Sequence, residues 1–123
     1  CRIASATTTV KVEVILPKWR PRRKAEPDVR LFWNTLFSDI KRHEEQHVDI
    51  AKAHARELEA KLKAVGRQKS CEIAQAKAKR VTETTLAAHD RAQAQFDRVE
   101  TINFESRILR LLRYRIEQSQ AKN

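Results

Sequence analysis

The hydrophobic pattern divides the chain into a short alternating segment and three longer segments with helical periodicity. In residues 7–16, Val10, Val12, Val14 and Leu16 occupy every second position. β-Branched residues at a period of two predict a strand, which Pro17 ends. The next segment, residues 17–27, contains all three prolines and five basic residues. We expect it to be a loop at the surface.

From Asp28 to Val65 the apolar period becomes helical, with Pro27 and Asp28 suited to the helix start and Gly66 to its end. One face of this helix is continuous. It comprises Trp33, Leu36, Ile40, His43, Glu44, His47, Ala51, His54, Leu58 and Leu62. This face is apolar at both ends and carries histidines and a glutamate in its middle.

Two further helices are predicted, at residues 70–99 and 104–118. The first has an alanine-rich face, and the turn at Gly66 makes it the antiparallel partner of the preceding helix. The second is amphipathic, with arginines around its apolar side. We therefore predict a mostly helical α+β fold, with N-terminal strands, a helical hairpin and a short C-terminal helix. A main domain would span residues 1–103, and residues 104–123 would form a basic amphipathic helix.

The middle of the long helix contains an HExxH sequence, residues 43–47. Residues i and i+4 lie one turn apart, so His43 and His47 can bind one metal ion. Zinc accepts imidazole nitrogens, and Glu44 would lie at the open coordination position of the metal. There it could activate a zinc-bound water for peptide-bond hydrolysis. Glu44 also interrupts an apolar stripe, where an unpaired carboxylate is costly.

A third protein ligand must come from another part of the chain. His54 is about 10 Å further along the helix than His47, so we expect it to be a packing residue. Counting back from the Gly66 turn favours His89, and Glu100 becomes possible if the chain folds back. The full set of candidates is His89, Asp90, Asp97, Glu100 and Glu105.

Composition limits the other classes of function. The single Gly excludes glycine-rich phosphate-binding loops, and no apolar run is long enough for a membrane span. The net charge of +10 is concentrated in the two ends of the chain, which suggests an anionic partner such as a cell-envelope polymer. A basic helical module that binds nucleic acid or an acidic protein is the alternative, carried by residues 20–24 and 107–115. Because aromatic residues are only 6% and do not alternate with basic ones, nucleic acid is the weaker choice.

The two cysteines, Cys1 and Cys71, do not form a CxxC pair. They could form one disulfide in an oxidising compartment or remain two buried thiols, and Cys1 could instead be acylated.

The chain resembles the bacterial predicted secreted zinc-dependent proteases, a family catalogued as a domain of unknown function. The resemblance covers roughly residues 1–101. It rests on Cys1-Arg2, the alternating segment ending in Leu16-Pro17-Lys18-Trp19, Trp33, the HExxH sequence, Glu57-Leu58, Ser70-Cys71, Ala92-Gln93 and Phe96-Asp97. It implies a secreted or periplasmic zinc peptidase that acts on peptide or protein substrates. It also implies that His43 and His47 are ligands, that Glu44 is the catalytic acid and base, and that Cys1 pairs with Cys71.

Two departures from the family pattern leave alternatives open. Family members usually have a further segment before the position of Cys1, so we expect that segment to be missing here. After the aromatic-Asp pair the family tends to read Thr-x-His-Gly, whereas this chain has Asn103 and Phe104 at the last two positions. Glu100 could replace a lost histidine ligand. Otherwise the chain would be a catalytically inactive relative.

Overall fold

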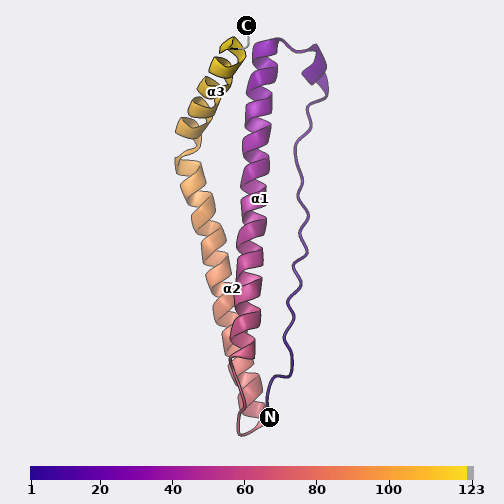
Figure 1. The fold of residues 1–123 in the computed structure, drawn as a ribbon, viewed down its shortest axis with the longest axis vertical. Coiled ribbons are helices and arrows are strands. Elements are labelled where there is room, and N and C mark those ends of the chain that lie inside the picture. The colour runs from indigo at the N-terminus through magenta and orange to yellow at the C-terminus, as the bar shows by residue number, and fades with distance from the viewer. Residues whose placement is uncertain (122–123) are drawn as a thin grey trace. The chain divides into compact units, whose positions relative to one another are not determined.

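The computed structural model describes residues 1–121, except for the side chain of Arg22. A short 3-10 helix, η1 (Arg20–Lys24), precedes three α-helices: α1 (Pro27–Lys63), α2 (Cys71–Ile102) and α3 (Phe104–Ala121) (Figure 1). The α-helices lie where the apolar periodicity predicts them. Residues 122–123, which belong to the predicted C-terminal segment, lie outside the described residues.

Local chemistry explains where the first two helices end and begin. Asp28 lies in the first turn of α1, and Lys61 and Lys63 lie in its last turn, so each charge matches the nearer end of the helix dipole. Gly66 follows α1 with a φ of 73°, a left-handed conformation that favours glycine. The hydroxyl of Ser70 accepts a hydrogen bond from the Ile73 amide (3.2 Å) and caps α2.

The prediction of N-terminal strands was wrong: none of residues 1–121 belongs to a β-strand, and the fold of this part of the chain is all-α instead of α+β. A strand needs a second strand to pair its backbone groups, which an alternating pattern cannot supply. Ala6, Thr8 and Val10 are half-buried and alternate with exposed residues. The Thr8 amide donates to the Glu59 carboxylate (2.6 Å), so a helix side chain occupies the place of a partner strand.

The chain divides into two compact units, and the first comprises Cys1–Val12 and His47–Phe96. Within it, α1 and α2 are antiparallel, because His47 contacts Gln93 and the later His54 contacts the earlier His89. The N-terminal residues are attached at the connection between the helices. Cys1 and Gln68 exchange two backbone hydrogen bonds (3.1 and 2.7 Å), and a disulfide joins Cys1 to Cys71.

The second unit comprises Glu13–Gln46 and the described part of Asp97–Asn123. Here α3 runs antiparallel to the first half of α1, since Arg107 contacts Asp39, whereas the later Ser119 lines a pocket with the earlier Leu31 and Asn34. Ile108 of α3 is buried. Trp33 lies between two other aromatic rings, with ring centroids 5.6 Å from Trp19 and 6.3 Å from Phe37.

Candidate metal site

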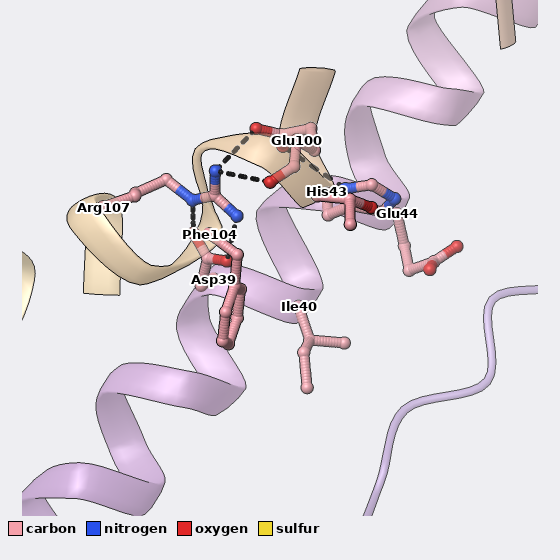
Figure 2. Close-up of a pocket in the computed structure, with 8 residues that line it drawn as sticks. Asp39, Ile40, His43, Glu44, Glu100, Phe104 and Arg107 are labelled. Atoms are coloured by element: carbon pink, nitrogen blue, oxygen red, sulfur yellow. Dashed lines mark hydrogen bonds and ion pairs between the residues drawn. The ribbon is translucent and has the colours of Figure 1, made fainter. Parts of the chain in front are cut away.

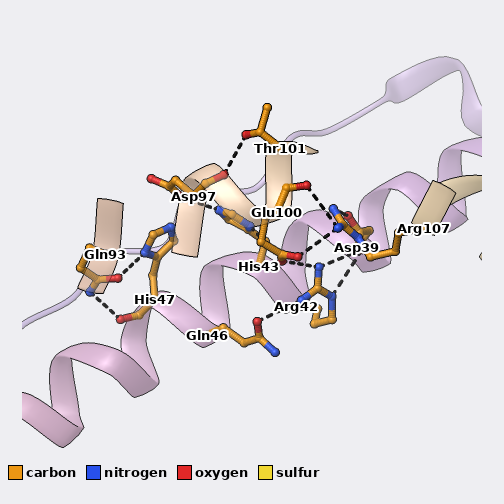
Figure 3. Close-up of polar contacts among 10 residues, drawn as sticks. All are labelled: Asp39, Arg42, His43, Gln46, His47, Gln93, Asp97, Glu100, Thr101 and Arg107. Atoms are coloured by element: carbon orange, nitrogen blue, oxygen red, sulfur yellow. Dashed lines mark hydrogen bonds and ion pairs between the residues drawn. The ribbon is translucent and has the colours of Figure 1, made fainter. Parts of the chain in front are cut away.

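The first histidine of the HExxH sequence lies between two carboxylates of α2. Nε2 of His43 is 2.9 Å from Oδ1 of Asp97, and Nδ1 is 3.3 Å from Oε1 of Glu100 (Figure 3). Asp97 and Glu100 are three residues apart, so they extend from the same face of α2. His43 is half-buried, Asp97 is 57% exposed and Glu100 is only 13% exposed.

The second histidine is held by Gln93 and Phe96. Nδ1 of His47 is hydrogen-bonded to Oε1 of Gln93. The amide nitrogen of Gln93 donates to the backbone carbonyl of His47 (2.9 Å), so the glutamine contacts both the ring and the main chain (Figure 3). The Phe96 ring meets the imidazole edge to face, with 4.9 Å between centroids.

Nδ1 of both histidines faces an acceptor oxygen, on Glu100 for His43 and on Gln93 for His47. This is the usual orientation of a histidine that binds a metal through Nε2. Nε2 of His43 also faces a carboxylate oxygen of Asp97, so a proton or a cation must lie between these two atoms. His43 and His47 lie one helical turn apart on α1, and they and Asp97 all have side chains that can bind a metal. Two imidazoles and one carboxylate are a donor set that suits zinc.

Glu44 and His43 line the same pocket, which has a volume of about 320 Å³. The pocket is lined by Asp39, Ile40, His43, Glu44, Glu100, Thr101, Phe104 and Arg107 (Figure 2). The Glu44 side chain is directed away from the pair formed by Glu100 and Arg107 (Figure 2). Glu44 is half-buried and Glu100 is ion-paired with Arg107, so the two carboxylates have different electrostatic surroundings.

Four charged side chains form a closed network behind His43. Arg107 and Arg42 both pair with Asp39 and with Glu100. Burial by itself raises the pKa of Asp39, but hydrogen bonds from Arg107 and Arg42 outweigh it, and the pKa lies below its ordinary value. The pKa of Glu100 is lowered in the same way: burial raises it, and hydrogen bonds from Arg42 and His43 have the larger effect. Both carboxylates are therefore held in the charged form.

The predicted third ligands lie in different environments. Glu100 contacts His43 but is also paired with two arginines, whereas Asp97 faces Nε2 of His43.

His89 lies beside His54, with 5.5 Å between ring centroids, and its Nδ1 is 3.2 Å from Asp90. Counting from Gly66 predicts that the residues of α2 level with His43 and His47 lie earlier in the sequence than they do. The reason is that the connection continues to Ser70 before α2 begins. Glu105 is in the first turn of α3.

Four residues were not predicted to belong to this site: Asp39, Arg42, Gln93 and Arg107. Gln93 belongs only to the family pattern, and neither Asp39 nor Arg42 belongs to any motif. Arg107 was expected on the outer side of an amphipathic helix, but it is 12% exposed and points into the network. The only local signal was the spacing of Asp39 and Arg42, which suits an ion pair on a helix.

The comparisons with known proteins identify a family. Residues 1–104 match a family described as bacterial protein of unknown function (DUF922). No curated protein and no solved structure was found to match the chain. None of the described helices combines the length and apolar character that crossing a membrane requires. Because the match covers most of the sequence, the chain belongs to the DUF922 family of bacterial proteins.

Proposed function

We propose that this chain is a zinc-dependent peptidase, with His43, His47 and Asp97 as metal ligands. The observation that carries this proposal is the pair of histidines one helical turn apart, each with Nδ1 directed to a protein oxygen. An acceptor oxygen at Nδ1 is typical of histidines that bind a metal through Nε2. The Asp97 carboxylate next to His43 would complete the three protein ligands of a catalytic zinc site.

Zinc, when bound, polarises a substrate carbonyl and lowers the pKa of a water molecule. Glu44 would take a proton from the attacking water and donate it to the leaving amine. Two observations support this role: Glu44 lies next to His43 in the sequence, and it lines the same pocket. Ile40 and Phe104 line that pocket as well, and they would contact an apolar side chain of the substrate.

The disulfide supports an extracytoplasmic location, because such bonds persist mainly in oxidising compartments. An inactive relative is less well supported. Asn103 is exposed between α2 and α3, and Asp97 offers a third ligand without it. A nucleic-acid-binding role for the arginines of α3 is also weaker, since Arg107 is used inside the protein and Arg115 contacts Ser38. An anionic cell-envelope surface remains a predicted partner, suggested by the charge alone.

The proposal is tested by hydrolysis of an unfolded protein mixture with the zinc-loaded chain. Glu44→Gln should abolish hydrolysis and leave zinc content unchanged, because the residue acts on the proton and not on the metal. Glu45→Gln is the matched control, since Glu45 is the exposed neighbour on the same helix. Equal activity of wild type and Glu44→Gln, or no zinc-dependent hydrolysis in any sample, would contradict the proposal.

A further inference from the structure

Glu100 was a candidate zinc ligand, but its contacts suit a different role. Its Oε1 atom accepts a 2.6 Å hydrogen bond from Arg42 and lies 3.3 Å from Nδ1 of His43. Its Oε2 atom accepts a 3.0 Å hydrogen bond from Arg107. Both oxygens are therefore already bound by cations. Its Oε1 atom faces Nδ1 of His43 and not Nε2, so Glu100 is not placed to bind a metal held by Nε2.

Arg107 is fixed on its other side by Asp39. Nε of Arg107 donates to Oδ1 of Asp39 (2.8 Å), and Nη2 donates to Oδ2 (3.1 Å). A two-point contact of this kind sets the plane of the guanidinium group, which a lysine could not reproduce. Asp39 is 4% exposed, so the pair is shielded from water. The position of Glu100 therefore depends on a residue of α3.

We infer that Glu100 is a positioning residue for His43 and that Arg107 holds it in place; this inference rests on the proposed zinc site. A carboxylate that accepts the Nδ1 proton fixes the tautomer and the rotation of a ligating imidazole. Glu100 contacts Nδ1 of His43 while Asp97 faces Nε2. Because Arg107 lies outside residues 1–104, the site extends beyond the segment that matches the family.

The test is the zinc affinity of the full chain, measured by competition with a chromophoric chelator. Loss of a partner of a ligating histidine typically lowers metal affinity roughly 10- to 100-fold. Glu100→Gln removes the charge that Arg42 and Arg107 hold, so its side chain is no longer fixed against Nδ1 of His43. This variant and Arg107→Lys should each have an effect of this size while still binding about one zinc ion at saturation. Arg110→Lys is the matched control, because Arg110 is exposed on the same helix. Should Arg107→Lys unfold, as circular dichroism would show, Glu100→Gln alone decides, since it keeps the shape of the side chain.

A second readout separates positioning from direct ligation. With cobalt(II) in place of zinc, the visible absorption spectrum reports the ligand set. Glu100→Gln should keep the wild-type bands, whereas Asp97→Asn should change them. Wild-type zinc affinity in Glu100→Gln, or loss of the cobalt bands in that variant, would overturn the inference while leaving the zinc site intact. Absence of zinc binding by the wild type would overturn the proposed function, and the inference with it.

Discussion

Gln93 contacts His47 at two points: its side-chain oxygen accepts from Nδ1 of the ring, and its amide nitrogen donates to the backbone carbonyl of the same residue (2.9 Å). One side chain of α2 thus fixes the rotation of the imidazole and also joins α2 to the backbone of α1 at His47. The contact is the counterpart, at the second histidine, of that between Glu100 and His43. Each histidine of the HExxH sequence has its own partner on α2.

Replacing Gln93 should therefore weaken metal binding without removing a ligand. Gln93→Ala removes the acceptor at Nδ1 of His47, and we expect zinc affinity to fall about 10-fold or more. The measurement is the same chelator competition, with the exposed Gln95→Ala as the control. Affinities of the two variants that do not differ would mean that Gln93 has no influence on His47 as a ligand.

The pair of Asp39 and Arg107 predicts a loss of stability in acid. The pKa of Asp39 is lower in the folded protein than its ordinary value of 3.8. Its contribution is thus fully present above that ordinary value and is lost as the pH falls through the lower, folded-state pKa. In urea unfolding, the free energy of unfolding of the wild type should fall between neutral pH and about pH 3.

Asp39→Asn tests whether this residue causes the effect. The variant leaves Arg107 with only Glu100 as its ionic partner, so we expect about 3 kcal/mol lower stability at neutral pH. Its stability should also depend less on pH than that of the wild type over the acid range. A variant with the acid sensitivity of the wild type would show that other carboxylates are responsible.

The disulfide should contribute strongly to the stability of the first unit. It joins residues 70 positions apart, and a loop of this length corresponds to about 4 kcal/mol in the chain-entropy model. Cys71→Ser should lower the free energy of unfolding by about that amount, and a reductant should have the same effect on the wild type. If the reductant leaves wild-type unfolding unchanged, the bond does not contribute in this way.

The helices and the shared face of His43 and His47 could be predicted because they depend on local sequence. The apolar period predicts a helix around residues 43–47, and a spacing of four residues on a helix puts His43 and His47 on one face. Whether residues 7–16 form a β-strand could not be predicted from the local sequence. Alternation at Val10, Val12 and Val14 predicts an extended backbone, but a strand also needs a partner from elsewhere in the chain.

The partners of the histidines depend on how one helix is aligned with another. The length of the connection after α1 decides whether His89 or Gln93 meets His47, and seven residues lie between α1 and α2. Arg107 illustrates a second limit. Its position on an arginine-rich helix is typical of an exposed residue, and only the buried Asp39 explains why it points inward. Buried ion pairs between distant segments leave no periodic signal in a sequence.

The zinc content of the purified chain, measured by mass spectrometry after preparation without chelators, tests the proposed metal site. The wild type should contain about one zinc ion per chain, and His47→Ala should contain almost none, because two ligands hold zinc far more weakly than three. His54→Ala is the matched control, since His54 is on the same helix but bonds to the Ile50 carbonyl, and it should keep its zinc. No zinc in the wild type, or equal zinc in wild type and His47→Ala, would contradict the account.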